Sequence, residues 1–373
     1  MIQTDVVICG GGPAGLSAAI ACRLQGFEVV VVDCVRAPID KACGEGLLPD
    51  ALNVLQQLGV DLGTPATGTF RGIRFVDEDA TVEATFPNGT ARGVRRTHLH
   101  TALRERAEEL AVGLLWGTQA LAIESEGNEF VQLRTSQGII RARWLIGADG
   151  LHSRVRLWSG LDHSGSSVRR IGLRMHLEIS PWSGFTEVHW HATGQAYITP
   201  IGANEIGLAL VGRERYTSIA AALRHFPALE ARLLGVPRTS EERGAATVTR
   251  AFRRVTTGRI ALLGDASGSI DAITGAGISL AFEQSLALAA ALRSGSLAPY
   301  EIRHREIRRR PALMSHALLL LDRYPRLRRV SMMSFQRNPA LFQQMLAVHS
   351  GAGPLRVWGR HGALDLGLQL LCG

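Results

Sequence analysis

The strongest constraint on the fold lies at the start of the chain. A short apolar run, residues 5–9, ends in the glycine-rich segment 10–15, and a helix-like stretch follows at 16–25. A second apolar run, residues 28–32, then ends in Asp33. Strand, glycine turn, helix, strand and acid occur here in the order that a dinucleotide-binding β-α-β unit requires. The sequence therefore predicts such a unit.

The glycines and the acid each have a physical role in this prediction. Gly10 allows a tight turn, Gly12 lets the backbone approach a pyrophosphate, and Gly15 lets the helix pack closely on the strand. The first turn of the helix offers unpaired N–H groups and the positive end of its dipole to the phosphates. Asp33 can accept hydrogen bonds from a ribose. The fingerprint occurs once, so we expect one tightly held dinucleotide.

The charge balance is strongly basic and of an unusual kind. The net charge is +8, and among 41 basic residues Lys41 is the only lysine. The arginines are scattered, and no helix-turn-helix, zinc-finger or RNA-binding aromatic motif accompanies them. We therefore expect no nucleic-acid partner, and we regard the position of the single lysine as informative.

The cysteines and the apolar runs exclude several other classes of protein. The five cysteines form no CxxC or metal-ligand spacing, which argues against a disulfide framework, a disulfide reductase and a metal site. His189 and His191 flank Trp190 on a predicted strand, but no third metal ligand is evident. The sequence has neither a signal-peptide pattern nor an apolar run of about 18 residues, so we expect a cytoplasmic protein.

The hydrophobic pattern of the middle of the chain predicts an inserted domain. Residues 93–110 are helix-like, and 118–145 predict an antiparallel excursion with turns at 126–128 and 136–138. Alternating segments between 168 and 251 predict an antiparallel sheet, joined by two segments from earlier in the chain. The strands expected in this sheet are 71–75, 80–86, 171–179, 187–190, 196–199 and 206–211.

The chain then returns to the first domain through residues 259–263 and ends in helices. After Pro299 we expect helices at 302–310, 312–329 and 340–349. The predicted fold is α/β, with a Rossmann-type nucleotide-binding domain, an inserted antiparallel-sheet substrate domain and C-terminal helices. The predicted boundaries are 1–70, 96–167 and 252–300 for the first domain, 71–95 and 168–251 for the second, and 301–373 for the helical segment.

Three segments carry a family resemblance. They are 10–15 (Gly-Gly-Gly-Pro-Ala-Gly), 147–156 (Gly-Ala-Asp-Gly-Leu-His-Ser-Arg-Val-Arg) and 263–268 (Leu-Gly-Asp-Ala-Ser-Gly). In this order and at these separations they resemble the p-hydroxybenzoate hydroxylase-like flavoproteins, over residues 1–300. That family includes aromatic and polyketide hydroxylases, flavin halogenases and geranylgeranyl reductase-like enzymes. The resemblance implies a FAD-dependent oxidoreductase with NAD(P)H as its transient reductant.

The resemblance also implies roles for single residues. In that family the aspartate matching Asp265 hydrogen-bonds the FAD ribityl chain, and the segment matching Asp149 supports the pyrophosphate region and NAD(P)H use. The arginine matching Arg96 leans toward the phosphates and ribityl. Independently, the helix predicted from Ile278 follows a glycine turn, and its dipole would stabilise negative charge at the flavin N1–C2=O edge by about 0.3–1 kcal/mol. The predicted cofactor-binding residues are Gly10, Gly12, Pro13, Ala14, Gly15, Asp33, Cys34, Lys41, Gly44, Arg96, Asp149, Gly264, Asp265, Gly275, Ala276, Gly277 and Ile278.

The segment 41–47 (Lys-Ala-Cys-Gly-Glu-Gly-Leu) is the most individual part of the sequence. It is similar to the Cys-Gly-Gly segment of geranylgeranyl reductase-like proteins, with Glu45 in place of the second glycine. We predict Cys43 and Glu45 as catalytic residues that face the isoalloxazine, and Lys41 near the adenosine or the phosphates. The alternative is a glycine-bent loop in which Cys43 is simply buried.

The resemblance leaves two reactions open. The first is NAD(P)H-dependent monooxygenation that hydroxylates an aromatic, polyketide or lipid-like substrate, favoured by the complete 147–156 pattern. The second is reduction of C=C bonds in a prenyl or other lipid chain. Gly268 and Asp271-Ala272 favour the second, because hydroxylases of the family often have a histidine and a proline there. Halogenation is not expected, since the Trp-x-Trp-x-Ile-Pro segment is missing. A third alternative is a flavin-holding protein without turnover.

The C-terminal part of the sequence suggests which substrate and which partners the protein binds. We expect a small hydrophobic or aromatic substrate, with the apolar residues 318–321 and 341–346 walling a tunnel for it. The arginine-dense stretches 302–310 and 323–329 form either a solvated face or a cationic surface that meets anionic lipid or an acyl-carrier protein. The expected location is cytoplasmic or peripheral to the inner membrane surface, and the sequence leaves a monomer and a dimer open.

Overall fold

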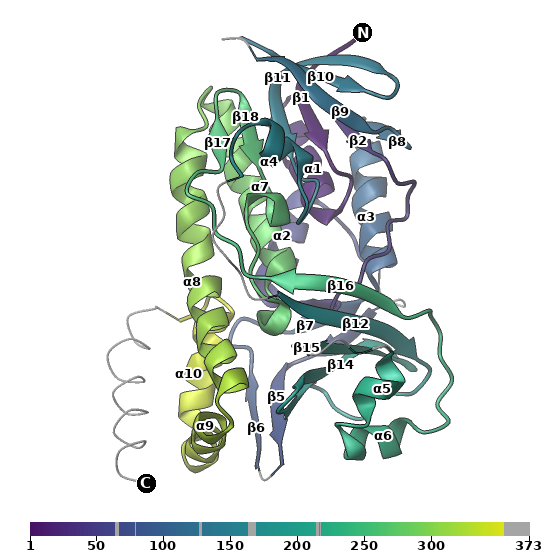
Figure 1. Cartoon of the computed structure of the whole chain (residues 1–373), viewed down its shortest axis with the longest axis vertical. Coiled ribbons are helices and arrows are strands. Elements are labelled where there is room, and N and C mark those ends of the chain that lie inside the picture. Colours follow the sequence, from purple (N-terminus) through teal and green to yellow (C-terminus); the bar gives the residue numbers. More distant parts are fainter. Residues whose placement is uncertain are drawn as a thin grey trace.

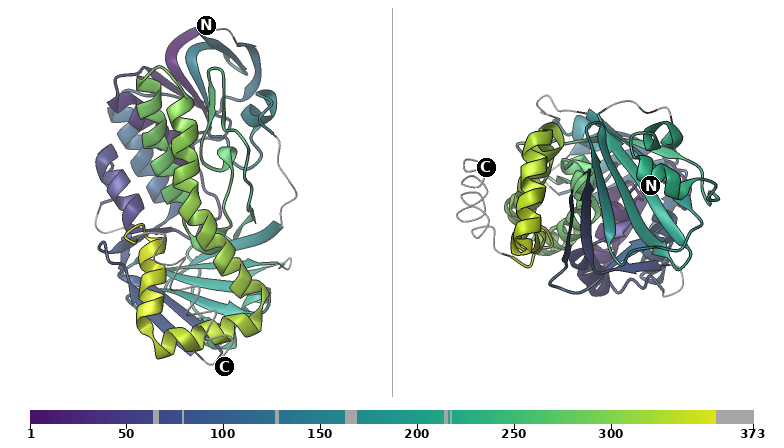
Figure 2. Two further views of the ribbon diagram at one scale, coloured as in Figure 1. Left: turned by 90° about the vertical axis from the view of Figure 1, so that its left-hand side faces the viewer. Right: turned by 90° about the horizontal axis from the view of Figure 1, so that it is seen from below.

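Two large sheets and a side layer of helices form most of the described structure. The computed structural model describes residues 1–63, 67–78, 80–126, 129–162, 169–213, 216 and 218–353. Figure 1 shows the two large sheets one above the other, with the long helix α8 (Ala298–Arg323) running along the side of both. The last helices turn across the second sheet, as both views of Figure 2 show.

The first sheet is mainly parallel and contains the predicted fingerprint. Its central strand β1 (Ile2–Cys9) pairs in parallel with β2 (Val29–Asp33) and with β11 (Gly138–Gly147). The other strands are β8 (Gly113–Trp116), β9 (Ala120–Glu126), β10 (Val131–Thr135), β17 (Thr256–Thr257) and β18 (Ile260–Leu262). The predicted antiparallel excursion is confirmed, because β9, β10 and β11 pair antiparallel. Its predicted turn at 126–128 lies partly outside the described residues.

Helices cover the first sheet because its strands are apolar on both faces. Val6, Val7 and Ile8 are fully buried, which is typical of a parallel strand with helices on either side. Helix α1 (Pro13–Leu24) follows β1 and packs against three later helices. The helices of this domain are α1, α2 (Pro49–Leu58), α3 (Arg96–Glu109), α4 (Arg154–Trp158) and α7 (Gly277–Arg293). The predicted Rossmann-type domain is thereby confirmed.

The second sheet confirms the inserted domain with one correction to its pairing. Its strands follow the order β16-β12-β15-β14-β13-β5-β6. Strands β13 and β5 pair in parallel, whereas the other neighbours are antiparallel. The reason is topological, since the β5–β6 hairpin comes from an early part of the chain and is added at the side of a later meander. The strands are β5 (Gly72–Asp77), β6 (Ala80–Thr85), β12 (Arg169–Leu177), β13 (Thr186–His191), β14 (Gly194–Gly202), β15 (Glu205–Gly212) and β16 (Arg243–Val248).

Smaller elements join the two sheets. Strands β3 (Gly46–Leu47), β4 (Thr67–Phe70) and β7 (Ala91–Val94) form a three-stranded sheet that packs on β14. The helix predicted at 93–110 therefore begins only at Arg96, because the preceding residues pair in β7. Two short helices that the pattern did not predict, α5 (Ile219–Leu223) and α6 (Pro227–Leu233), follow β15.

The C-terminal helices are confirmed, but their boundaries differ from the prediction. Helix α8 continues through Pro311, where the sequence predicts a break. The proline removes one backbone donor, and packing of α8 on α7 still holds the helix together. The chain breaks instead before α9 (Pro325–Arg337) and α10 (Pro339–His349), each of which has proline in its first turn. Among the described helices, none has both the length and the apolar character to cross a membrane.

Candidate cofactor and substrate site

A cavity of about 670 Å³ lies where the first sheet meets the second. Its walls include the carboxyl ends of parallel strands, where α/β folds place their ligands. Of the predicted site residues, Gly15 and Ala276 are outside the lining. The predicted residues that line it are Gly10, Gly12, Pro13, Ala14, Asp33, Cys34, Lys41, Cys43, Gly44, Glu45, Arg96, Asp149, Gly264, Asp265, Gly275, Gly277 and Ile278.

The three glycines of the fingerprint differ in what surrounds them. Gly10 has a φ of +111°, and a Cβ there would lie 2.3 Å from the Ala148 carbonyl oxygen. A Cβ on Gly15 would lie 1.8 Å from the Gly10 carbonyl oxygen. The space beside Gly12 is open, since a Cβ added there would have Arg96 Nη2 as its nearest neighbour, at 3.8 Å. Gly10 and Gly15 therefore allow close packing within the protein, while Gly12 leaves room for a ligand.

The carboxylates of Asp33 and Asp149, two predicted cofactor-binding residues, hold nearby backbone segments in place. The Asp33 carboxylate accepts hydrogen bonds from Gly11 N at 2.7 Å and from Val35 N at 2.8 Å. The Asp149 carboxylate accepts from Ser153 Oγ and from the first backbone N–H groups of α4, Arg154 N at 2.7 Å among them. Asp149 thus shapes the wall of the cavity by fixing the loop before α4.

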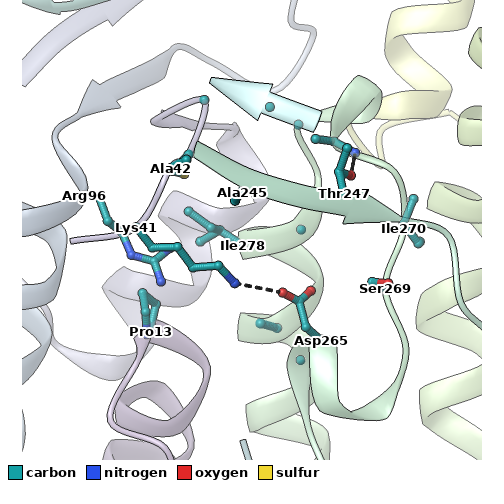
Figure 3. Close-up of a pocket in the computed structure, with 18 of the residues that line it drawn as sticks. Pro13, Lys41, Ala42, Arg96, Ala245, Thr247, Asp265, Ser269, Ile270 and Ile278 are labelled. Carbon is teal, nitrogen blue, oxygen red and sulfur yellow. Dashed lines mark hydrogen bonds and ion pairs between the residues drawn. The ribbon is translucent and has the colours of Figure 1, made fainter. Parts of the chain in front are cut away.

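Charged side chains face each other across the start of α1. Figure 3 shows Lys41 reaching from one wall toward Asp265 on the other, above Pro13. Lys41 Nζ lies 3.7 Å from Asp265 Oδ2, and both side chains are about half exposed. Arg96 lies beside them, and its Nε is buried without a hydrogen-bond partner in the described chain. Two cations near a helix N-terminus suit a pyrophosphate.

A tightly held turn precedes α7. The short helix η2 (Ala272–Thr274) leads into Gly275, which has a φ of +64°. Ile273 is fixed at both its backbone groups, because Asp271 accepts from its N–H and Tyr197 Oη donates to its carbonyl at 3.1 Å. A Cβ on Gly275 or Gly277 would meet nothing within 4 Å. The N-terminus of α7 is therefore open to a planar ring.

A buried charge network anchors this turn to the second sheet and to α8. Arg170, which is 1% exposed, donates to Asp271 at 2.7 Å and to Gln195 at 2.5 Å. Its guanidinium also lies 3.8 Å from Asp322 of α8, and Arg213 donates to Asp322 at 3.0 Å. This network could not be predicted from the sequence, because its residues are far apart in the chain and no motif marks them.

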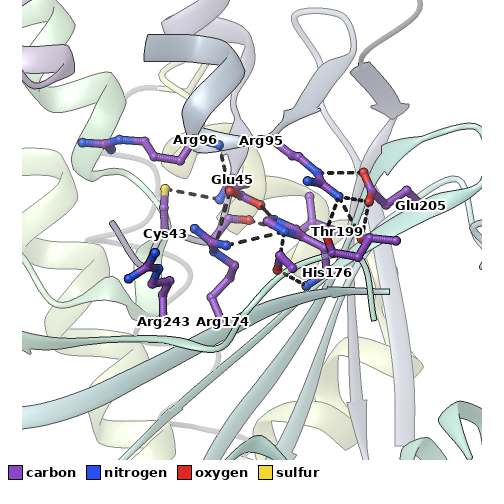
Figure 4. Close-up of polar contacts among 12 residues, drawn as sticks. Cys43, Glu45, Arg95, Arg96, Arg174, His176, Thr199, Glu205 and Arg243 are labelled. Atoms are coloured by element: carbon purple, nitrogen blue, oxygen red, sulfur yellow. Dashed lines mark hydrogen bonds and ion pairs between the residues drawn. The ribbon is translucent and has the colours of Figure 1, made fainter. Parts of the chain in front are cut away.

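Glu45 points into the second sheet. Its backbone is left-handed, with a φ of +59°, and the residue is 2% exposed. Its carboxylate accepts from Arg96 N at 2.8 Å and lies 2.5 Å from His176 Nε2, as Figure 4 shows. Arg174 lies 3.7 Å from the same carboxylate. Both carboxylate oxygens are thus engaged within the protein, and His176 and Arg174 are site residues that sequence reasoning missed.

Cys43 remains at the cavity wall. It is partly buried, and its Sγ accepts a hydrogen bond from Glu45 N at 3.3 Å. His189 and His191, in contrast, are not part of the cavity lining. Cys43 therefore keeps a position from which it can contact a ligand.

The far half of the cavity is an apolar chamber between the second sheet and the C-terminal helices. Phe75 of β5 and Phe342 of α10 pack against each other in its wall, with ring centroids 4.9 Å apart. The chamber residues are Leu48, Phe70, Ile73, Phe75, Val188, Tyr197, Met314, Leu318, Phe342, Met345 and Leu346. The predicted apolar stretches at 318–321 and 341–346 contribute Leu318, Phe342, Met345 and Leu346, whereas Leu320 faces outward.

Comparison with known proteins agrees with this geometry. The family model described as FAD binding domain matches residues 3–295. The chain belongs to this family. It is an FAD-dependent oxidoreductase with a Rossmann-type FAD domain, as the resemblance to p-hydroxybenzoate hydroxylase-like proteins implies.

Individual relatives of this FAD-binding chain differ in reaction. It is 27% identical over 322 residues to the menaquinone reductase of Mycolicibacterium smegmatis, covering 80% of this chain and 78% of that protein. It is 33% identical over 178 residues to a 3-(3-hydroxy-phenyl)propionate/3-hydroxycinnamic acid hydroxylase of Mycobacterium sp. (strain JLS), covering 44% of this chain and 31% of that protein. The solved flavoprotein/dehydrogenase of Cytophaga hutchinsonii has a TM-score of 0.80 at 20% identity, over 94% and 93% of the two chains.

Proposed function

We propose that the chain is an NAD(P)H-dependent FAD monooxygenase that hydroxylates an apolar aromatic, polyketide or lipid-like substrate. The observation that carries this proposal is the apolar chamber, which is continuous with the glycine-rich cradle. An apolar site with a few polar groups suits an oxygenating reaction that must limit access of water. The similarity to a hydroxylase of phenolic acids supports the same reaction class.

The residues of the cradle fit FAD in one orientation. We assign the pyrophosphate to Gly12 and the start of α1. The cationic side chains of Arg96 and Lys41 lie at this end of the cavity. Asp33 would face the adenosine ribose and Asp265 the ribityl chain. The flavin edge would then meet the open turn at Gly275. When bound and reduced by NAD(P)H, FAD supplies the electrons and activates O₂.

The chamber's own residues position the substrate and keep its surroundings dry. Tyr197 lines the chamber and Thr199 lines another part of the cavity, and their hydroxyl groups donate to the carbonyls of Ile273 and Gly44. Burial raises the pKa of Tyr197 above its ordinary value, so the proton stays on its oxygen. One atom of O₂ enters the substrate and the other leaves as water, with two electrons from NAD(P)H and one added proton.

Reduction of a C=C bond is the second candidate. It is favoured by the menaquinone reductase of Mycolicibacterium smegmatis, which matches this chain over most of both lengths. A hydride and a proton would be added across the double bond, so an acid must lie at the substrate carbon. Cys43 is the side chain of the predicted catalytic segment that is placed to serve there.

Isotope labelling separates the two reactions. After a panel of phenolic and prenyl lipids has shown which compound accelerates NAD(P)H consumption, the reaction is run under ¹⁸O₂. We expect one ¹⁸O atom in the product and no turnover without O₂. Anaerobic turnover to a product two mass units heavier would establish the reductase instead. FAD retention without substrate-dependent NAD(P)H loss would show a binding protein.

We also propose that α8 and α9 dock on an anionic lipid surface. Leu313, Leu320 and Met333 on these helices, and Tyr324 between them, are each more than 40% exposed. Between residues 313 and 337, all of which are described, every exposed charged side chain is an arginine. The inner side of α8 lines the chamber through Met314 and Leu318. A lipid-like substrate could therefore pass from the bilayer surface to the chamber.

Vesicle co-sedimentation tests this docking. We expect salt-sensitive binding to vesicles that contain phosphatidylglycerol and not to pure phosphatidylcholine. The double variant Arg323→Ala/Arg326→Ala should bind about 30-fold more weakly, since each arginine near the surface contributes about 1 kcal/mol. The control pair Arg134→Ala/Arg143→Ala removes two exposed arginines of the first sheet and should bind normally. Equal loss in both variants would refute a specific surface.

A further inference from the structure

A buried histidine lies behind the glycine turn that precedes α1. His100 belongs to α3, is fully buried, and is not among the described residues that line the cavity. Its Nε2 lies 2.9 Å from the carbonyl oxygen of Gly11, the middle glycine of the turn. A carbonyl can only accept a hydrogen bond, so Nε2 of His100 carries the hydrogen and donates it.

This hydrogen bond also fixes the group on the other side of the same peptide unit. The carbonyl of Gly11 and the N–H of Gly12 belong to one planar trans peptide, in which the two groups point in opposite directions. His100 is buried within the protein, so the N–H of Gly12 is directed away from it, and Gly12 itself lines the cavity. The contact with His100 therefore sets the direction of a backbone donor at the cavity wall.

The preceding peptide unit is held from other elements of the first domain. Asp33, at the end of β2, accepts a hydrogen bond from Gly11 N at 2.7 Å. The indole of Trp116 in β8 covers Gly11, since a Cβ added there would lie 2.3 Å from Trp116 Cζ3. The rings of His100 and Trp116 pack together, with centroids 5.7 Å apart. Gly11 is thus fixed from β2, α3 and β8, and its two peptide units have little freedom to rotate.

Helix α3 contacts two successive glycines through side chains that are one helical turn apart. Arg96 precedes His100 by four residues, so both side chains lie on one face of the helix. Arg96 lines the cavity, and its Nη2 lies 3.8 Å from the position that a Cβ of Gly12 would occupy. The guanidinium of Arg96 can therefore contact an anion beside Gly12, while the imidazole of His100 holds the backbone behind it.

We propose that His100 is a positioning residue for the cofactor, which aims the N–H of Gly12 at the pyrophosphate of FAD without touching FAD itself. A backbone donor that is already oriented binds an anion more tightly, because less conformational freedom is lost on binding. This inference rests on the proposed function for the place of the pyrophosphate. It adds a residue outside the cavity that controls the affinity for the cofactor.

The dissociation constant of FAD, measured for matched histidine variants, tests this role. The side chains of His100→Met and His100→Gln have the same length, but only glutamine carries an N–H donor. His100→Met should raise the dissociation constant about tenfold, and His100→Gln should stay within about threefold of the wild type. His98→Leu is the control on the same helix, because Nε2 of His98 contacts a different carbonyl, that of Leu62, at 2.6 Å. It should bind FAD as the wild type does.

Two fragments of the cofactor localise the effect to the pyrophosphate. ADP contains the pyrophosphate and riboflavin does not, and each is titrated into the protein after FAD has been removed. We expect His100→Met to weaken the binding of ADP by the same factor as that of FAD, and to leave the binding of riboflavin unchanged. Thermal unfolding of the same samples shows whether the FAD-free variant is folded, and His100→Leu takes its place if it is not.

Three results would overturn the proposal. The first is an affinity for ADP that is the same in His100→Met and in the wild type. The second is a loss of FAD affinity in His100→Gln as large as that in His100→Met, since the donor would then have no part in the effect. The third is an equal loss for ADP and riboflavin, which would show general damage to the cavity.

The experiment distinguishes this inference from the proposed reaction. The titrations contain neither NAD(P)H nor substrate, so a failure to incorporate ¹⁸O leaves the result with ADP unaffected. Conversely, an enzyme that hydroxylates its substrate, but whose His100→Met variant binds ADP and FAD normally, would retain the proposed function and lose the role of His100.

Discussion

A Gly12→Val variant should fold normally and fail to hold FAD. The backbone of Gly12 is at φ −72° and ψ 178°, which any residue adopts, and a Cβ there finds its nearest neighbour at 3.8 Å. The added side chain would fill the space at the start of α1 where we place the pyrophosphate. We expect FAD affinity to fall about 100-fold or more, equivalent to about 3 kcal/mol. Visible absorbance after gel filtration and thermal unfolding of the FAD-free protein measure the two effects separately.

Gly15→Ala is the matched comparison within the same motif. Here a single methyl group would lie 1.8 Å from the Gly10 carbonyl oxygen, so the helix and the strand must move apart. We expect this variant to lose about 3 kcal/mol or more of unfolding free energy, whether or not FAD is present. A yellow, fully loaded Gly12→Val protein would contradict our placement of the pyrophosphate.

Arg170→Met should be among the most destabilising substitutions in the chain. Its guanidinium lies between the buried carboxylates of Asp271 and Asp322, each of which is 2% exposed. Removing the cation leaves Asp271 without its ion-pair partner in a buried site. We expect a loss of about 3–5 kcal/mol, measured by urea unfolding of the holoenzyme.

Two controls decide whether the loss comes from uncompensated charge. Adding Asp271→Asn and Asp322→Asn to Arg170→Met removes the buried anions and should restore a large part of the stability. Arg303→Met breaks an exposed pair with Glu306 and should change the unfolding free energy by less than about 1 kcal/mol. If Arg170→Met behaved like Arg303→Met, the network would not anchor the turn before α7.

Local patterns were enough to predict the cradle. The glycine turn, its flanking strands and the acid Asp33 lie within a short stretch, so spacing alone indicates their arrangement. The glycine turn before α7 was found in the same way, because a strong helix follows it. Most predicted residues consequently line one cavity.

Contacts between distant segments could not be predicted from such patterns. The carboxylate of Glu45 contacts His176, which is 131 positions away in the chain. No sequence pattern near Glu45 indicates that partner. The left-handed backbone of Glu45 was likewise not indicated by any local pattern. Arg170 and Asp322 meet for the same reason, through the packing of α8 on the second sheet.

The length of α8 sets the separation of the cofactor cradle and the substrate chamber. Its first half packs on α7 beside the FAD domain, and its second half carries Met314 and Leu318 into the chamber wall. The helix has 26 residues and is therefore about 39 Å long. Any widening of the chamber relative to the cradle must bend this helix. The bend is easiest at Pro311, because proline has no backbone N–H and one hydrogen bond of the helix is therefore missing.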